Sequence, residues 1–207
     1  MGDPQSATVT AYEQYAAVYR DCSSSMPDDV AALVRRFAAA LGSGSRVLEI
    51  GSGSGRDAAA LEAAGLSVRR TDVTQAFVDL LRADGHDADV LDPLVDDLTD
   101  PERPDVAYDG VWASACLLHV DRKDLPDVAA RLAEATRIDG LLHAALKEGD
   151  GEAWSTHGSV AAPRHFTFWR EGPLRDLLEQ AGWSVDEVDQ VGGLRGDTWL
   201  NVLARRR

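Results

Sequence analysis

Apolar positions recur along the chain in two alternating patterns. In residues 28–41 they recur every three to four positions, as in Val30, Val34 and Phe37, which predicts an amphipathic helix. Residues 46–50 (Arg-Val-Leu-Glu-Ile) predict a short buried strand, which the glycine loop follows at once. Strands that alternate with helices at this pace predict a parallel sheet with helices on both faces. The predicted strands are residues 46–50, 66–71, 88–91, 108–116 and 141–147, and the predicted helices are residues 28–41, 56–64, 74–83, 125–136 and 173–182.

The last part of the chain breaks this alternation. Residues 183–188 and 198–204 both predict strands, and the glycine-rich stretch between them is too short for a helical crossover. These two strands are therefore expected to pair antiparallel. The fold class that follows is α/β, a doubly wound Rossmann-like sheet of seven strands, mostly parallel, with an antiparallel C-terminal hairpin strand. The sequence contains no internal repeat or linker, so residues 1–207 are predicted to form a single domain.

Composition narrows the class of protein. The chain has 207 residues, 44% of them hydrophobic, and its apolar runs stay well short of the roughly 20 residues that span a bilayer. Two cysteines cannot form a disulfide framework, and the first residues do not resemble a signal peptide, so a cytoplasmic protein without a membrane partner is predicted. The net charge of −14 argues against a nucleic-acid partner and favours a small molecule. Monomer and homodimer both stay open.

The strongest chemical signal is the glycine-rich stretch at residues 47–55, directly after the first predicted strand. Glycines at a strand-to-helix turn allow positive φ and bring the backbone close to a ligand. A dinucleotide fingerprint that begins at Gly51 needs glycine at position 56, where this chain has Arg56. Glu49 precedes the loop, and a carboxylate there suits a ligand with an ammonium group better than it suits a pyrophosphate.

A second acid, Asp72, stands at the end of the second predicted strand, 21 residues after Gly51. A carboxylate at this place can accept hydrogen bonds from both ribose hydroxyls of a nucleoside ligand. The alternative is an ordinary tight turn accompanied by two solvated acids. The agreement between the loop, Glu49, Asp72 and the strand order favours a ligand site.

These features resemble the class I S-adenosylmethionine-dependent methyltransferases, in particular their small bacterial group. Residues 49–55 (Glu-Ile-Gly-Ser-Gly-Ser-Gly) resemble the first motif of that superfamily, and Asp72 resembles its acid after the second strand. Residues 91–93 resemble the segment that reaches the adenine amino group, and residues 108–115 resemble the fourth-strand motif. Residues 137–142 resemble the turn into the fifth strand, although relatives usually read Lys-Pro-Gly-Gly there.

The resemblance implies S-adenosylmethionine as the cofactor and S-adenosylhomocysteine as its product. Gly51 and Gly53 would run alongside the methionine part of the cofactor, Glu49 would lie near its ammonium group, and Asp72 would hold the ribose. Val73 and Asp92 would flank the adenine, and Ala113 would lie under the sulfonium side. The full predicted cofactor set is Tyr12, Tyr19, Glu49, Gly51, Ser52, Gly53, Arg56, Asp72, Val73, Asp92, Pro93 and Ala113.

Tyrosines recur at helical spacing ahead of the first strand, at Tyr12, Tyr15 and Tyr19. They either pack on the sheet as an aromatic stripe or belong to a helix that closes over the cofactor, as it often does in relatives, and both interpretations stay open. Residues 1–41 are accordingly predicted to form an N-terminal helical cap.

The acceptor is expected beyond the carboxyl ends of the strands, where ligands bind in open α/β sheets. His119 follows the fourth strand and is the candidate general base, although a histidine that only holds the turn is the commoner case. Residues 149–170 are punctuated by glycine and rich in aromatic residues, and they are predicted to form a lid or acceptor segment. Within this segment Trp154, Arg164 and His165 are predicted to face the substrate.

The predicted reaction is transfer of a methyl group from S-adenosylmethionine to a small-molecule acceptor, at oxygen or nitrogen, by in-line displacement. A metal site is not predicted, because the sequence shows neither acids near the end of the fourth strand nor zinc-like spacing of His and Cys. Two alternatives stay open. One is a non-catalytic S-adenosylmethionine-binding module, and the less favoured one is a nicotinamide-dependent oxidoreductase, which Arg56 and Glu49 disfavour.

Overall fold

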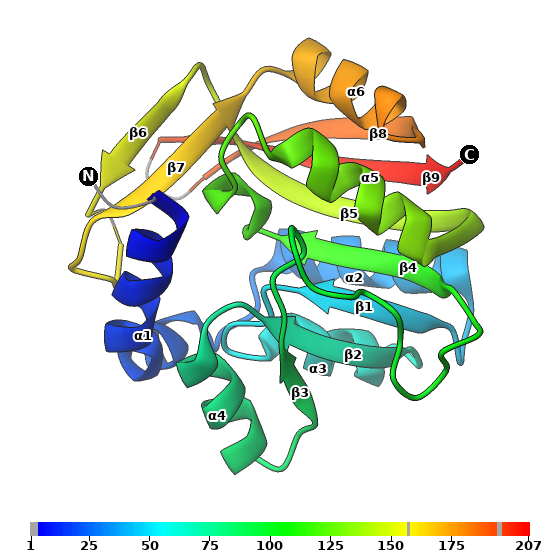
Figure 1. The fold of residues 1–207 in the computed structure, drawn as a ribbon, viewed down its shortest axis with the longest axis horizontal. Helices are drawn as coiled ribbons and strands as arrows, with labels where there is room; N and C mark the ends of the chain where they lie inside the picture. Colours follow the sequence, from blue (N-terminus) through cyan, green and yellow to red (C-terminus); the bar gives the residue numbers. More distant parts are fainter. Residues whose placement is uncertain (1–3, 157, 194–195) are drawn as a thin grey trace.

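Within the described residues of the computed structural model, 4–156, 158–193 and 196–207, nine strands form one mixed sheet with helices on both faces (Figure 1). None of these helices is long and apolar enough to cross a membrane. The helices are α1 (Pro4–Ser23), α2 (Asp28–Leu41), α3 (Arg56–Ala63), α4 (Gln75–Ala83), α5 (Leu125–Ala135) and α6 (Glu171–Gln180), with a 3-10 helix at Leu117–His119. The strands are β1 (Arg46–Ile50), β2 (Ser67–Asp72), β3 (Ala88–Val90), β4 (Tyr108–Ser114), β5 (Thr136–Glu148), β6 (Glu152–Ser155), β7 (Arg164–Trp169), β8 (Trp183–Gly192) and β9 (Thr198–Arg206).

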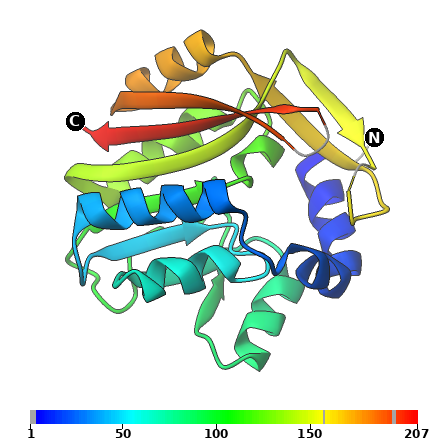
Figure 2. The ribbon, with the colours of Figure 1, turned by 180° about the vertical axis from the view of Figure 1, so that it is seen from behind.

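Burial on both faces explains why the central strands read as apolar runs. All five residues of β1 are buried. Val47 belongs to a core formed with α2 and α3, whereas Leu48 belongs to the opposite core formed with α5 and α6. Val111 and Trp112 repeat this alternation in β4. Figure 2 shows α2 and α3 in front of the sheet, and Figure 1 shows α5 and α6 on the other side. The predicted doubly wound architecture is confirmed.

The strand order also confirms a mostly parallel sheet with an antiparallel end. The strands β3, β2, β1, β4 and β5 are parallel neighbours in that order. Strand β9 runs antiparallel to both β5 and β8 and lies between them. The short connection between β8 and β9 produces this pairing, because it leaves no room for a crossover helix.

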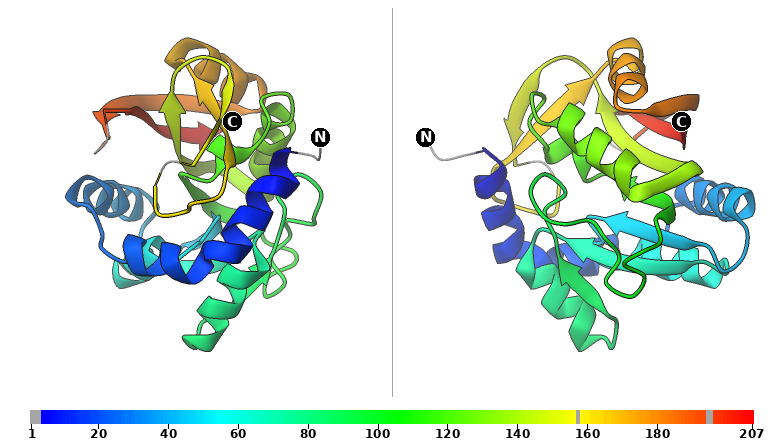
Figure 3. Two further views of the ribbon diagram at one scale, coloured as in Figure 1. Left: turned by 90° about the vertical axis from the view of Figure 1, so that its left-hand side faces the viewer. Right: turned by 45° about the vertical axis from the view of Figure 1, so that its right-hand side comes forward.

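The predicted count of seven strands is wrong, because residues 149–170 contribute two further strands. Strand β6 pairs antiparallel with β7, and β7 joins the carboxyl end of β5, where Phe168 lies beside Lys147. The aromatic and threonine residues of β7 favour a strand, but the glycines around them indicated a loop. The hairpin β6–β7 lies beside α1 (Figure 3). Residues 1–3 of the predicted cap and residue 157 of the predicted lid lie outside the described residues.

The turn expected at residues 137–140 lies inside β5 rather than before it. Asp139 has a φ of +62°, and the register between β4 and β5 shifts between Tyr108 and Gly110. Strand β5 therefore begins with an irregular stretch, and its continuous pairing with β4 starts at Leu141, the predicted first residue of the strand.

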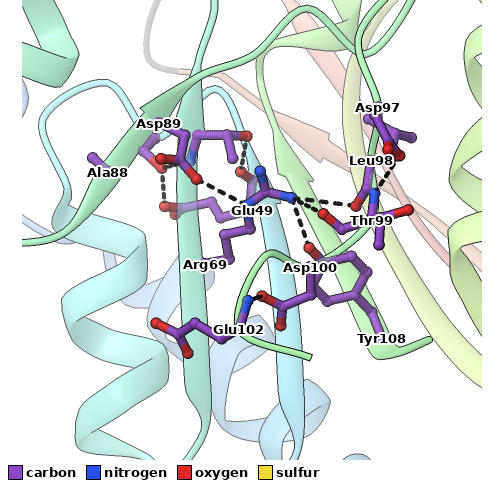
Figure 4. A network of polar contacts seen from close by, with 12 residues as sticks. Glu49, Arg69, Ala88, Asp89, Asp97, Leu98, Thr99, Asp100, Glu102 and Tyr108 are labelled. Atoms are coloured by element: carbon purple, nitrogen blue, oxygen red, sulfur yellow. Dashed lines mark hydrogen bonds and ion pairs between the residues drawn. The ribbon is translucent and has the colours of Figure 1, made fainter. Parts of the chain in front are cut away.

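A polar network ties the irregular segment of residues 91–107 to the sheet. Arg69 in β2 donates hydrogen bonds to Asp89 in β3 at 3.0 Å and to the hydroxyl of Tyr108 in β4 at 2.9 Å. It also donates to the carbonyl oxygens of Leu98 and Thr99 at 3.2 and 3.0 Å (Figure 4). Arg46 also donates to Asp100, and Arg131 donates to the carbonyl oxygen of Pro93, so three guanidinium groups hold a segment that forms neither helix nor strand.

Helix α1 lies at the carboxyl end of the sheet and contacts α4 and β7 (Figures 1 and 3). The Glu13 carboxylate accepts the backbone N–H groups of Gln75 and Ala76 at 2.7 and 3.0 Å. It therefore caps the N-terminus of α4, where the Thr74 side chain makes no capping hydrogen bond. On the other side of α1, the Thr8 hydroxyl accepts the backbone N–H of His165 at 2.9 Å.

The substitution Glu13→Ala should lower the free energy of unfolding by about 1–2 kcal/mol, because it removes a charged cap from the positive end of α4. Gln14→Ala, at an exposed position one residue further along α1, should change it by less than about 0.5 kcal/mol. Urea denaturation of both variants measures the difference. Equal stabilities would show that Glu13 contributes nothing as a cap.

Candidate active site

The turn between β1 and α3 contains three glycines with positive φ. Gly51, Gly53 and Gly55 have φ values of +72°, +52° and +76°. A Cβ atom at Gly51 would overlap the Cβ of Cys116, which follows β4, so only glycine fits where these two segments meet. The predicted glycine turn is therefore required by the packing of β1 against the end of β4.

Glu49 in β1 lies beneath this turn, and only 1% of its surface is exposed. The Ser52 hydroxyl donates a hydrogen bond to its carboxylate. Burial raises the pKa of Glu49 to about 8, and the nearby charges of Asp57 and Asp72 add to the rise. At neutral pH the carboxyl is largely protonated, and a positively charged ligand group beside it would favour the ionised form.

The Asp72 carboxylate lies next to the same turn, at the end of β2. Its two oxygens accept the backbone N–H groups of Gly53 at 2.9 Å and of Thr74 at 2.8 Å. Burial raises the pKa of Asp72, and these two hydrogen bonds oppose the rise. An ionised carboxylate offers about four acceptor positions, so both oxygens can still accept a donor such as a ribose hydroxyl.

A cavity of about 60 Å³ adjoins the glycine turn. Ligand pockets are usually larger than about 300 Å³, so a ligand of nucleoside size requires a shift of α1 or of the side chains beneath it. Half of the twelve lining residues belong to the predicted cofactor set. The lining consists of Tyr19, Ser23, Glu49, Gly51, Ser52, Gly53, Ser54, Arg56, Asp57, Trp112, Ser114 and Ala115.

Other predicted cofactor residues lie outside this cavity. Ala113 is fully buried in β4, and Ala115, with a φ of +58°, lines the cavity instead. On the expected adenine side, the Asp92 carboxylate accepts a hydrogen bond from the Gln5 amide of α1 at 3.0 Å. Pro93 is buried there and Val73 is half-buried, so the adenine side is closed by α1 in this structure.

Tyr12 and Tyr19 form an aromatic cluster with Phe77 of α4. The centroid of the Tyr12 ring is 5.6 Å from that of Tyr19 and 5.8 Å from that of Phe77, and the Tyr19 and Phe77 centroids are 5.4 Å apart. Burial raises the pKa of Tyr19 to about 12. The two tyrosines thus pack as an aromatic stripe, and Tyr19 also covers the cavity at the glycine turn.

His119 meets this cluster from the end of β4. Its Nδ1 lies 2.6 Å from the carbonyl oxygen of His165, so Nδ1 carries the proton and donates it. Its Nε2 therefore accepts the hydrogen bond from the Tyr12 hydroxyl, at 2.9 Å. Burial lowers the pKa of His119 to about 4, which leaves the imidazole neutral at physiological pH.

The predicted substrate residues divide into two groups. Arg164 and His165 are buried in β7, and Arg164 donates a hydrogen bond to the Tyr12 hydroxyl at 3.1 Å. Trp154 in β6 is 50% exposed, and its ring lies 5.3 Å from the His165 ring. The structure therefore brings Arg164 and His165 next to His119 and Tyr12, and it leaves Trp154 at the surface.

Sequence reasoning missed the part played by Asp57 at the start of α3. The indole of Trp112 donates to its carboxylate at 3.0 Å, and Arg56 donates to it at 2.8 Å. Arg56 also donates to the carbonyl oxygens of Ser23 and Ser25 at 3.3 Å, which ties the end of α1 to the start of α3. The sequence signal for this role was the position of Asp57, an acidic residue in the first turn of the helix after the glycine loop.

Fold and site together define a class of protein. An open α/β sheet with a glycine turn at the carboxyl end of its first strand binds a small ligand at that end. Two buried acids at the turn favour a ligand with positive charge over a phosphate. In the part of the chain that the structure describes, no group of three or more His, Cys, Asp or Glu side chains is arranged to hold a metal ion.

Comparison with known proteins identifies the family. The sequence profile of the family described as "Methyltransferase domain" matches residues 23–188, which is well over half of the chain. This chain therefore belongs to the methyltransferase domain family. Among curated proteins, none matches the sequence significantly.

Solved structures share the fold at low sequence identity. The 1,6-didemethyltoxoflavin-N1-methyltransferase of Burkholderia thailandensis, solved with 1,6-didemethyltoxoflavin and S-adenosylhomocysteine, is 21% identical with a TM-score of 0.72, and the match covers 100% of this chain and 91% of that one. The magnesium protoporphyrin IX methyltransferase of Synechocystis PCC 6803, solved with S-adenosylmethionine, is 14% identical with a TM-score of 0.74 and coverage of 100% and 99%. The cyclase SpnF is 15% identical with a TM-score of 0.73 and coverage of 98% and 96%.

The family confirms the predicted enzyme class as far as a methyltransferase. The solved structures confirm the Rossmann-like fold. They do not test the roles of individual residues in this chain, so those roles stay predictions.

The substitution Glu49→Gln should raise the free energy of unfolding more at pH 8 than at pH 5. A carboxyl whose pKa is higher in the folded than in the unfolded state contributes stability below its unfolded pKa, near 4.5, and that stability is lost as pH rises through about 8. The glutamine variant has no such loss, so its gain should reach as much as about 4 kcal/mol at pH 8.

Urea denaturation between pH 5 and pH 8.5 measures this difference. Glu134→Gln, at an exposed position on α5, is the control and should follow the wild-type pH profile. Parallel profiles for Glu49→Gln and the wild type would contradict the prediction.

Proposed function

We propose that this enzyme transfers the methyl group of S-adenosylmethionine to a small-molecule acceptor, at oxygen or nitrogen, by in-line displacement. The observation that carries the proposal is the buried Glu49 carboxyl beneath a glycine turn, beside a cavity that α1 covers. The net charge of −14 disfavours a nucleic-acid acceptor. The Burkholderia protein is named for methylation of 1,6-didemethyltoxoflavin at N1, which supports a small-molecule acceptor.

The chemistry of the residues fits the cofactor best at its amino-acid end. Glu49 would face the ammonium group, and its ionisation would be favoured by that charge. The backbone of Gly51 and Gly53 would run alongside the methionine part of the cofactor. Asp72 would accept hydrogen bonds from the ribose hydroxyls through its remaining lone pairs. These assignments use groups that already lie at or beside the cavity, and Ser52 and Arg56 also line it.

The adenine side requires a rearrangement. Val73, Asp92 and Pro93 would hold the adenine only after the Gln5–Asp92 hydrogen bond opens and α1 moves. Ala113, fully buried beneath the site, would act by shaping its floor through Ala115 and not by direct contact. The helical cap of residues 1–41 is therefore proposed to open for cofactor entry and to close afterwards.

When bound, S-adenosylmethionine supplies a methyl group on a positively charged sulfur that leaves as S-adenosylhomocysteine. The residues of this chain would align the acceptor behind the methyl carbon and exclude water. Tyr12 and Tyr19 would close the site from α1, and Arg164 and His165 would bound it from β7. Residues 149–170 are proposed to act as a lid, which would bring the exposed Trp154 toward the acceptor.

His119 is proposed as the catalytic group, acting through Tyr12. Because its Nδ1 donates to the carbonyl oxygen of His165, its Nε2 is free of a proton and accepts from the Tyr12 hydroxyl. A proton lost by the acceptor would pass to the Tyr12 oxygen as the Tyr12 proton passes to Nε2. The pKa of His119 of about 4 means that Nε2 would hold this proton only transiently.

Two rival functions use the same kind of fold. A nicotinamide-dependent oxidoreductase would place a pyrophosphate at the glycine turn, where the buried Glu49 carboxyl disfavours it. A non-catalytic S-adenosylmethionine-binding module would not need the hydrogen-bonded set formed by Arg164, Tyr12 and His119. That set favours an enzyme.

Calorimetric titration with S-adenosylhomocysteine and, separately, with NADH tests the proposal. We expect S-adenosylhomocysteine to bind and Asp72→Asn to weaken that binding at least tenfold, because hydrogen bonds to a charged group contribute about 1.5–3 kcal/mol each. Asp79→Asn, at an exposed position on α4, should bind as the wild type does.

Binding of NADH without binding of S-adenosylhomocysteine would overturn the proposed cofactor. Equal loss of affinity in Asp72→Asn and Asp79→Asn would instead remove Asp72 from the cofactor site.

A further inference from the structure

Arg164 is a buried cation on the β7 side of the proposed site, with only 5% of its surface exposed. Its Nη1 donates to the Tyr12 hydroxyl at 3.1 Å. Its guanidinium carbon lies 5.4 Å from the centroid of the Tyr12 ring and 5.2 Å from that of Phe166. A guanidinium buried at this place is a fixed positive charge on the β7 side of the proposed site.

A second cation, Lys147, lies at the carboxyl end of β5, where that strand pairs with β7. Its Nζ is 5.3 Å from the ring centroids of both Phe166 and Trp199. Its side chain is 16% exposed, and it forms an ion pair with Asp197 at 2.8 Å. The ring of Phe166 therefore lies within cation–π distance of both Arg164 and Lys147, which places the two cations in one neighbourhood.

Two cations lie on the β5 and β7 side of the Tyr12–His119 pair, and Asp72 lies on the side of the glycine turn. Burial raises the pKa of Tyr12. Arg164 opposes this rise, and the charge of Asp72 adds to it. Burial lowers the pKa of His119 to about 4, and the charges of Arg164 and Lys147 lower it as well. Asp72 thus acts on Tyr12 from the end of β2, and Arg164 and Lys147 act on His119 from β7 and β5.

We infer that the methyl acceptor carries a carboxylate, which Arg164 and Lys147 hold while its nucleophilic atom lies toward His119. The inference rests on the proposed methyl transfer, because it names the class of the acceptor. A carboxylate is planar and matches the guanidinium fork with two parallel hydrogen bonds, and a lysine adds a point charge. The acidic side of the site then receives the cationic cofactor and the basic side receives the anionic acceptor.

Neighbouring carboxylates are compatible with this role. Asp121 and Glu152 lie 3.5 Å from the two ring nitrogens of His165, so they act on that residue. Asp197 holds Lys147 from a position that is 28% exposed. A bound carboxylate would share Lys147 with Asp197 or displace it.

Matched carboxylate and amide probes test the inference. Benzoate with benzamide, and 4-hydroxybenzoate with 4-hydroxybenzamide, are titrated into the protein with and without saturating S-adenosylhomocysteine, and ligand-detected NMR follows binding. We expect each carboxylate to bind at least tenfold more tightly than its amide. That preference should fall at least fivefold in Arg164→Gln and in Lys147→Gln, and it should persist in Arg103→Gln, at an exposed position in the segment before β4.

Thermal unfolding of each variant accompanies the titrations, and Lys147→Gln carries the test if Arg164→Gln does not fold. Equal binding of carboxylate and amide, binding of neither, or a preference that survives in the folded variants overturns the inference. A carboxylate preference that depends on Lys147 in a protein that does not bind S-adenosylhomocysteine overturns the proposed methyl transfer and supports the anion site.

Discussion

Burial of two carboxyl groups at the base of α1 is the constraint on which the rest of the site depends. Glu49 is 1% exposed, and burial raises its pKa to about 8, so the neutral form of the group is favoured in this structure. Asp72 has two backbone N–H groups that favour its charge. Tyr19 of α1 lines the cavity above Glu49, so a helix that precedes every strand in the sequence helps to set the chemistry of residues in β1 and β2.

The same helix couples the cofactor side to the acceptor side. Glu13 caps α4, Thr8 binds the backbone of β7, and Arg56 holds the end of α1 against α3. A cavity of about 60 Å³ means that a ligand of nucleoside size displaces either part of α1 or the side chains beneath it. Because Tyr12 lies on that helix and is bonded to His119 and Arg164, a displacement of α1 also disturbs the acceptor side.

The parts of the fold that periodicity specifies could be predicted from the sequence. Three features each allow only one local arrangement of the chain: the buried strand β1, the glycine turn after it and the short β8–β9 connection. The hairpin β6–β7 was missed, because glycines flank a strand whose partner lies at the tip of β5. The local pattern of apolar and polar residues carries no information about a pairing strand that lies elsewhere in the sequence.

The same limit applies to the site. Glu49 and Asp72 could be placed because each stands at a strand position next to the glycine turn. Ala113 was predicted to face the cofactor, but the positive φ of Ala115 turns the chain so that Ala115 lines the cavity. The Tyr12–His119 bond joins residues 107 positions apart, and only the docking of α1 brings them together.

The fold alone does not choose the reaction, since a cyclase and methyltransferases share it at 14–21% identity. Charge narrows the choice. Methyl transfer from a sulfonium to an anionic nucleophile neutralises charge, so ion pairs that hold the nucleophile weaken in the transition state and slow the step. If Arg164 and Lys147 bind a carboxylate, that carboxylate is better used for recognition than for attack. The attacking atom is then a neutral oxygen or nitrogen that must lose a proton. In the proposed mechanism the Tyr12–His119 pair, in which Nε2 carries no proton, receives that proton.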